Sequence, residues 1–169
     1  MEKLTHLEII KKKIMTGEEL KHHLSVWRFL EKKIVFTNGC FDILHLGHVD
    51  YLSKAADFGN ILIIGVNSDA STRRLKGPNR PINDEISRSM LLSSLHFTDA
   101  IIIFDEETPY ELIKLVRPDV LVKGSDYNLS NIVGADIVKS YNGLVQTIEF
   151  LPGYSTSIIE ERIKSGDKS

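Results

Sequence analysis

The amino-acid sequence predicts an α/β protein in which helices cover both faces of a doubly wound, five-stranded parallel sheet. Five short runs rich in isoleucine and valine recur along the 169 residues. Each run is nearly continuous in apolar residues, as in strands buried on both faces. Helical patterns separate the runs, and this alternation is typical of right-handed parallel crossovers. Such a sheet would bind its ligand beyond the carboxyl ends of the strands.

The order of elements follows from these patterns. Strands are predicted at Ile34–Phe36, Ile61–Val66, Ala100–Phe104, Val120–Val122 and Leu144–Phe150. Helices are predicted at about 47–58, 84–95, 108–116, 130–141 and 156–164. Thr108 and Pro109 are typical of a helix start, with threonine as the cap and proline at the first helical position.

A further helix is predicted before the first strand, over residues 17–31. Leu20, Leu24, Trp27 and Leu30 recur there at helical spacing. The helix would therefore be amphipathic and would cover the sheet or one of its edges.

Length and composition indicate an ordinary globular protein. With 42% hydrophobic and 26% charged residues, we expect one domain over residues 1–169, with residues 1–32 as a helical extension packed on it. The net charge of −2 argues against nucleic acid as a partner. No apolar run approaches the roughly 20 residues of a membrane span, and the N-terminus lacks a signal-peptide core. We therefore expect a cytoplasmic protein with no membrane partner.

The stretch FTNGCFDILHLGHVDYL, residues 36–52, carries the strongest functional signal. Gly39 lies in the turn after the first strand, where backbone N–H groups can approach phosphate. His45 and His48 flank Gly47 at the start of the next helix and, three positions apart, can share one face. The helix N-terminus adds partial positive charge. Imidazole donors placed there would stabilise charge on an α-phosphate as pyrophosphate leaves.

Two other interpretations of the histidine pair are a zinc site and two structural histidines. Zinc needs a third protein ligand, and only Asp42 is near in sequence. The phosphate motifs G-x-G-x-x-G and G-x-x-x-x-G-K-[ST] do not occur, so phosphate would have to be held in another way.

The histidine motif resembles the HxGH signature of the nucleotidylyltransferase superfamily. More narrowly, VFTNGCFDILHLGHVDYL, GVNSD, LKGPNRPI, VLVKGSDY and GYSTS resemble, in order, segments of the D-glycero-β-D-manno-heptose 1-phosphate adenylyltransferases. The resemblance implies a Rossmann-like nucleotidylyltransferase fold. It also implies transfer of AMP from ATP, with Mg²⁺, to heptose 1-phosphate for lipopolysaccharide inner core or a related surface glycan.

The resemblance assigns residues to three roles and names no metal ligand. The catalytic residues would be His45, His48, Lys76 and Arg88. ATP would be bound by Phe36, Thr37, Asn38, Gly39, Cys40, Phe41, His45, Gly47, His48, Lys123, Gly124, Asp126, Tyr154, Ser155 and Thr156. The sugar phosphate would be bound by Asp42, Asn67, Asp69, Lys76 and Arg80.

Structural roles compete with several of these assignments. Asn67 and Asp69 suit a turn, and Ser155 suits the cap of the last helix. Arg88 suits an ion pair. Ser125 stands where the family usually has glycine, and serine would cost about 1 kcal/mol there if the backbone requires a positive φ.

Two other functions remain open. A glycerol-3-phosphate cytidylyltransferase shares the HxGH turn and the hydroxyl-rich final helix, although FTNGCFD and KGSDY favour the heptose enzyme. A module that binds ATP without turnover belongs to another class. The resemblance also implies a homodimer, with a kinase and a phosphatase on separate chains in the same pathway.

Overall fold

The computed structural model of the chain describes residues 3–125 and 132–166. Its centre is a sheet of five parallel strands in the order β3-β2-β1-β4-β5. The strands are β1 Ile34–Gly39, β2 Ile61–Asn67, β3 Ala100–Phe104, β4 Val120–Gly124 and β5 Leu144–Ile148. The predicted fold class is confirmed, with every predicted strand present.

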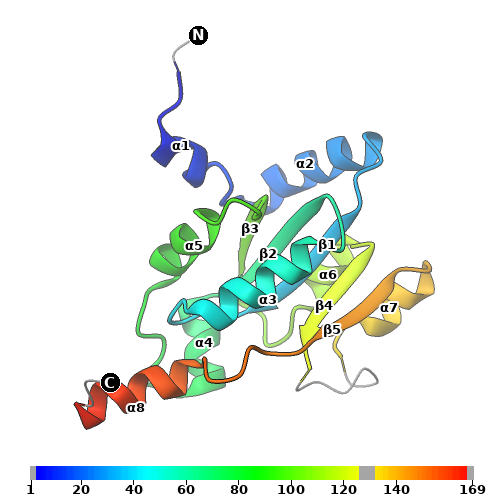
Figure 1. The fold of residues 1–169 in the computed structure, drawn as a ribbon. Coiled ribbons are helices and arrows are strands. Elements are labelled where there is room, and N and C mark those ends of the chain that lie inside the picture. The colour runs from blue at the N-terminus through cyan, green and yellow to red at the C-terminus, as the bar shows by residue number, and fades with distance from the viewer. Residues whose placement is uncertain (1–2, 126–131, 167–169) are drawn as a thin grey trace.

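The helices cover both faces of this sheet (Figure 1). They are α1 His6–Lys11, α2 Gly17–Phe29, α3 Leu46–Ala56, α4 Asp69–Lys76, α5 Glu85–Ser93, α6 Tyr110–Val116, α7 Ala135–Ser140 and α8 Thr156–Ser165. Within the described ranges, no helix is long and apolar enough to cross a bilayer.

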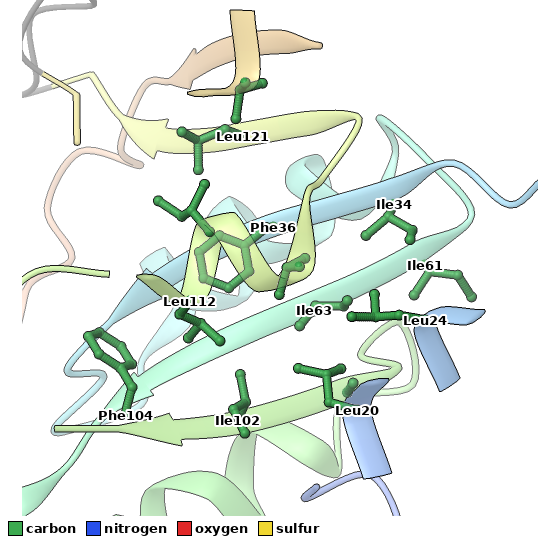
Figure 2. Packing of buried hydrophobic residues seen from close by; sticks show 14 of the residues in the cluster. Leu20, Leu24, Ile34, Phe36, Ile61, Ile63, Ile102, Phe104, Leu112 and Leu121 are labelled. Atoms are coloured by element: carbon green, nitrogen blue, oxygen red, sulfur yellow. The ribbon is translucent and has the colours of Figure 1, made fainter. Parts of the chain in front are cut away.

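Alternation along the strands divides the core into two clusters. On β1, Ile34 and Phe36 point to the face covered by α2, α6 and α7, while Val35 points to the face covered by α3 and α5. Figure 2 shows the first cluster, with Phe36 among leucines and isoleucines from other elements. Each large side chain buried in this way contributes roughly 1.5–3 kcal/mol to folding.

The N-terminal segment packs on the sheet as predicted, but over a shorter helix. Leu20 and Leu24 are 0% and 2% exposed, and Trp27 is partly buried against the same cluster. Leu30 is 53% exposed, so its predicted burial is wrong. The reason is that α2 ends at Phe29 and Leu30 lies beyond its last turn.

Before α2, the chain adds a short parallel bridge to the edge of β3. The N–H of Met15 donates to the carbonyl of Ile101 at 2.9 Å. The N–H of Ile101 donates to the carbonyl of Lys13 at 2.7 Å. The edge strand is therefore partly covered by the protein's own N-terminal segment.

Two local predictions are wrong. Gly77, Pro78 and Pro81 favour a loop over the basic segment 73–82, but the chain is helical up to Lys76, because Ser68 caps α4 through the N–H of Ser71 at 2.9 Å. The sequence of α4, DASTRRLK, has no apolar periodicity that would indicate a helix. Thr108 is not a cap, since α6 begins at Tyr110 after Pro109 and no side-chain hydrogen bond caps it.

Candidate active site

A cavity of about 650 Å³ lies at the carboxyl edge of the sheet. Residues at or just beyond the end of every strand contribute to its wall: Gly39, Asn67, Glu107, Gly124 and Phe150. The starts of α3 and α8 and the end of α4 lie at the same edge. The predicted location of the ligand site is therefore where the cavity lies.

The wall of the cavity combines polar and aromatic groups. It consists of Asn38, Gly39, Cys40, Phe41, Asp42, His48, Tyr51, Asn67, Leu75, Lys76, Arg80, Glu107, Thr108, Pro109, Lys123, Gly124, Val133, Phe150, Thr156 and Ser157.

The two histidines of the HxGH turn lie face to face at the start of α3. Their ring centroids are 3.8 Å apart with an interplanar angle of 21°. Both Nδ1 atoms are buried and make no hydrogen bond within the described part of the chain. A buried polar atom without a partner costs roughly 1–3 kcal/mol. The pair is therefore arranged for a ligand that supplies the missing partners.

Both imidazoles are held in the neutral form at physiological pH. The pKa of His48 is lowered to about 4, chiefly by burial and to a smaller extent by the nearby His45 and Lys76, while a hydrogen bond with the backbone of Ile43 acts in the opposite direction. Burial also lowers the pKa of His45. A neutral ring still offers one N–H donor to a phosphate oxygen, and the charge of the pair does not have to change during a phosphoryl reaction.

The turn before α3 depends on two close approaches. A Cβ on Gly47 would lie 3.1 Å from the ring of His45 and 3.1 Å from the Cβ of Tyr154. Phe41 adopts a positive φ of 48° and places its ring edge-on to His48, with centroids 5.2 Å apart. These contacts fix the orientation of both histidines.

Asp42 lies on the wall but is bound by the loop that follows α4. Its Oδ2 accepts from Arg80 at 2.7 Å, and its Oδ1 accepts from the backbone N–H groups of Ile82 and Asn83 at 2.7 and 3.0 Å. Burial raises the pKa of Asp42, but these hydrogen bonds outweigh burial and the net pKa is lowered. Arg80 also forms an ion pair with Glu160 of α8. Arg80 thus joins the HxGH turn to the last helix.

Arg88 does not reach the cavity. Its side chain is 0% exposed and donates to the carbonyls of Asn83 and Cys40 at 3.0 and 2.6 Å. It also pairs with Asp69 at 2.8 Å. The ion-pair interpretation therefore describes Arg88 in this structure. The carboxylate of Asp69 is turned to Arg88, and neither residue belongs to the wall.

Three predicted residues lie on the wall at the ends of β2 and β4: Asn67, Lys123 and Gly124. Asn67 donates to the Oγ of Ser71 at 3.0 Å, and Lys123 hydrogen-bonds to the Oδ1 of Asn38. Ser125 does not adopt a positive φ, so the predicted cost of replacing glycine does not arise. Its N–H donates to Ile148 at 2.9 Å. Asp126 lies outside the described residues.

The start of α8 divides its hydroxyl residues between two roles. Ser155 caps the helix by accepting from the N–H of Ile158 at 3.2 Å. Thr156 and Ser157 lie on the wall of the cavity. Tyr154 lies next to Gly47 and is not one of the wall residues.

Two predicted ATP contacts have side chains in the body of the protein. Phe36 is part of the core cluster (Figure 2). Thr37 is buried and shares a hydrogen bond of 2.7 Å with the hydroxyl of Tyr51. Neither residue belongs to the wall of the cavity, because the strand holds both side chains below its edge, and their part in ATP binding stays a prediction.

Several wall residues were not predicted: Tyr51, Leu75, Glu107, Thr108, Pro109, Val133, Phe150 and Ser157. Tyr51 could have been found, because it follows His48 by three positions on the same helix. Glu107 to Pro109 also follow a predicted strand, and the rule that ligands bind at carboxyl ends applies to them as well.

Comparisons with known proteins agree with this geometry. Residues 36–162 match the family model described as cytidylyltransferase-like. The bifunctional protein HldE of Campylobacter curvus is 58% identical over 156 residues, which cover 92% of this chain and 32% of that protein. HldE of Wolinella succinogenes is 53% identical over 152 residues, covering 90% and 31%. The chain spans about a third of the length of these curated relatives.

Two solved structures resemble the fold. The lipopolysaccharide core biosynthesis protein from Thermoplasma volcanium has a TM-score of 0.57 and 32% identity, covering 71% of this chain and 97% of that one. Pantoate-β-alanine ligase from Francisella tularensis, complexed with β-γ ATP and β-alanine, has a TM-score of 0.58 and 16% identity, covering 89% and 76%. The second likeness concerns the fold alone.

Proposed function

Because the chain belongs to the cytidylyltransferase-like family, we propose that it transfers AMP from ATP to D-glycero-β-D-manno-heptose 1-phosphate. The products would be ADP-heptose and pyrophosphate. The five motifs that resemble the heptose 1-phosphate adenylyltransferases support this acceptor. So do the relatives named HldE and the structural neighbour named for lipopolysaccharide core biosynthesis.

The observation that carries the proposal is the stacked pair of neutral histidines at the start of α3. The buried Nδ1 atom of each ring has no hydrogen-bond partner among the described residues. In the proposed reaction, a phosphate oxygen of the sugar attacks the α-phosphorus of ATP. The bond from that phosphorus to the bridging oxygen breaks, and pyrophosphate leaves. Catalysis of this kind consists mainly of positioning and charge stabilisation.

The wall of the cavity and the neighbouring His45, which is not itself a wall residue, have roles in that reaction. His45 and His48 would donate hydrogen bonds to the oxygens of the α-phosphate, where charge develops. Lys76, exposed at the end of α4, would neutralise phosphate charge. Thr156 and Ser157 would hold the departing pyrophosphate, helped by the positive end of the α8 dipole. Arg88 would act indirectly, by fixing the carbonyl of Cys40 beside the nucleotide turn.

Magnesium is the expected companion of ATP in this site. Asn67, Thr156 and Ser157 offer oxygen donors on the wall, and Mg²⁺ prefers oxygen ligands, keeps several waters and usually binds through substrate phosphates. The residues therefore fit an ion carried by the triphosphate. When bound, it would neutralise charge on the leaving group.

The proposal extends to the setting of the enzyme. The product would serve lipopolysaccharide inner core or a related surface glycan, and the reaction would take place in the cytoplasm. A kinase and a phosphatase would supply heptose 1-phosphate, and the enzyme would work as a homodimer.

Pyrophosphate release tests the proposal. The protein is incubated with Mg²⁺, with ATP or CTP, and with a panel of sugar 1-phosphates and glycerol 3-phosphate. We expect release with ATP and heptose 1-phosphate, and ADP-heptose by mass spectrometry. Turnover of CTP with glycerol 3-phosphate would identify the cytidylyltransferase alternative instead. ATP binding without product from any acceptor would identify a non-catalytic module.

A further inference from the structure

The loop after β3 contains three consecutive acidic residues with different surroundings. Asp105 accepts a hydrogen bond from the Oγ of Ser68 and pairs with Arg74 at 3.3 Å. Glu106 accepts from the N–H of Asp105 at 3.1 Å. Glu107 is exposed and, of the three, is the one on the cavity wall. Two of the carboxylates therefore shape the loop, and the third faces the ligand space.

The backbone on both sides of Glu107 is anchored. The carbonyl of Glu106 accepts from the Oγ of Ser71 at 3.3 Å. On the other side, the buried Pro109 accepts from the N–H of Ile113 at 2.8 Å. Glu107 is thus held on the short loop between β3 and α6, whose backbone is anchored on both sides of it.

An ionised carboxylate directly beside a triphosphate would repel it, because both are negatively charged. The wall elsewhere carries Lys76 and Lys123, and the negative charge of Asp42 is balanced by Arg80. In the sheet order, two strands separate β3 from β4. The histidines follow β1, which lies between them. Glu107 therefore lies on the β3 side of the cavity, away from Lys123 on β4, and its charge disfavours an anionic group placed directly beside it.

That end of the cavity also suits a polyhydroxylated ligand. Asn67, which ends the neighbouring strand β2, shares the wall with Glu107 and Thr108. Together they offer a carboxylate, a side-chain amide and a hydroxyl, and an ionised carboxylate accepts hydrogen bonds from hydroxyl groups strongly.

From these contacts we infer that Glu107 binds hydroxyl groups of the acceptor sugar and sets the preference of the site for sugar phosphates. The inference rests on the proposed function, since it names the part of the same cavity that receives the sugar. Asp105 is excluded from this role by its bonds to Ser68 and Arg74, and Glu106 by its bond to the N–H of Asp105.

Steady-state kinetics of Glu107→Gln and Glu107→Ala test the inference, with Glu106→Gln as the matched control. We expect Glu107→Ala to raise the KM for heptose 1-phosphate roughly 10- to 100-fold, the range of a lost hydrogen bond to a charged group. The KM for ATP should change less than about threefold. Glu107→Gln should recover part of the loss, because its amide oxygen still accepts. Thermal melting of each variant confirms that the fold is retained.

Three outcomes would overturn the inference. An increase in the KM for ATP, or in the Mg²⁺ concentration needed for half-maximal rate, would assign the carboxylate to the metal–nucleotide complex. Unchanged kinetics in both Glu107 variants would show that it touches no substrate. A preference for choline phosphate over sugar phosphates, lost in Glu107→Gln, would identify a cationic acceptor.

The experiment separates this inference from the proposed function. If the wild-type protein releases no pyrophosphate with any sugar 1-phosphate, the proposed function fails. The Glu107 variants are then compared on whichever acceptor is used, and a KM effect confined to a hydroxylated acceptor would still support the role of Glu107.

Discussion

The two ends of the sheet each carry a cavity with charged residues on its wall, and the two cavities differ in how their buried polar groups are paired. The amino end has a cavity of about 410 Å³, lined by Arg28, Glu31, Lys32, Lys33, Arg117, Asp119 and Tyr141. There Arg28 donates to the carbonyl of Val116 at 2.6 Å, Asp119 accepts from Ile34 at 2.7 Å, and Tyr141 donates to Pro118 at 3.0 Å. At the carboxyl end, the buried Nδ1 atoms of the two histidines have no such partner among the residues that the structure describes.

The direction of the helices explains this difference. The helices α2, α6 and α7 end at the amino edge, each leading into a strand. Their terminal carbonyls favour cations, so the basic residues there serve the fold. The helices α3 and α8 begin at the carboxyl edge and direct unpaired N–H groups towards an anion. The comparison indicates that charged residues on a cavity wall do not by themselves mark a ligand-binding site. Buried polar groups without hydrogen-bond partners are the more informative sign.

The strongest test of the comparison removes one histidine. His48→Ala should lower kcat for pyrophosphate release by about 10²-fold or more, as for the loss of one donor to a developing oxyanion. Circular dichroism should show an unchanged fold. His22→Ala, an exposed histidine on α2, is the control and should keep the wild-type rate. Normal turnover by a folded His48→Ala protein would refute the assignment.

A second test breaks the bridge between the HxGH turn and α8. Arg80→Ala leaves the buried carboxylate of Asp42 without its cation, and we expect about 2–3 kcal/mol less stability in urea unfolding. The matched control is Arg73→Ala, an exposed arginine on α4, which should change stability by no more than about 0.5 kcal/mol. Equal effects of the two variants would show that the bridge contributes nothing.

A third test uses pH. The pKa of His48 is about 4 in the folded protein and about 6.5 in an unfolded chain. Between these values the unfolded state binds the extra proton, so stability falls as pH falls through this window. Between pH 7.5 and 5 the loss attributable to His48 should be about 1–2 kcal/mol.

The measurement is the urea midpoint of wild type and His48→Asn across that range. The variant should show the shallower dependence on pH. Carboxylates with lowered pKa values, such as that of Asp42, lose their contribution mainly below about pH 4 and do not confound the window. Identical slopes would mean that His48 titrates normally.

The smallest expected effect comes from a substitution in the amino-end cavity, which should change stability and leave catalysis unchanged. Tyr141→Phe at the amino-end cavity removes the hydrogen bond to Pro118 and should lower stability by about 1 kcal/mol. Its kcat and KM should match those of the wild type, because the residue lies at the end of the sheet opposite the histidines. A change in KM for either substrate would show that the amino-end cavity communicates with the reaction.

The predicted strands were found because continuous Ile and Val runs leave little alternative to burial within a sheet. The HxGH turn was found because glycine and two histidines rarely combine at a strand end without a ligand. By contrast, α4 was missed because a capped polar helix such as DASTRRLK has no apolar stripe. Glu107 and Phe150 follow β3 and β5, whose carboxyl ends lie at the edge with the cavity, but neither belongs to a motif that would separate it from the other residues after those strands. The assigned catalytic and binding roles stay predictions.

The contact of Lys13 and Met15 with Ile101 has a consequence for assembly. An open edge of a sheet is a template on which another chain can add a strand. The protein covers part of its β3 border with its own backbone, which makes the addition of a foreign strand less favourable there than along β5, at the opposite border. Strand addition is thereby disfavoured at one of the two borders of the sheet.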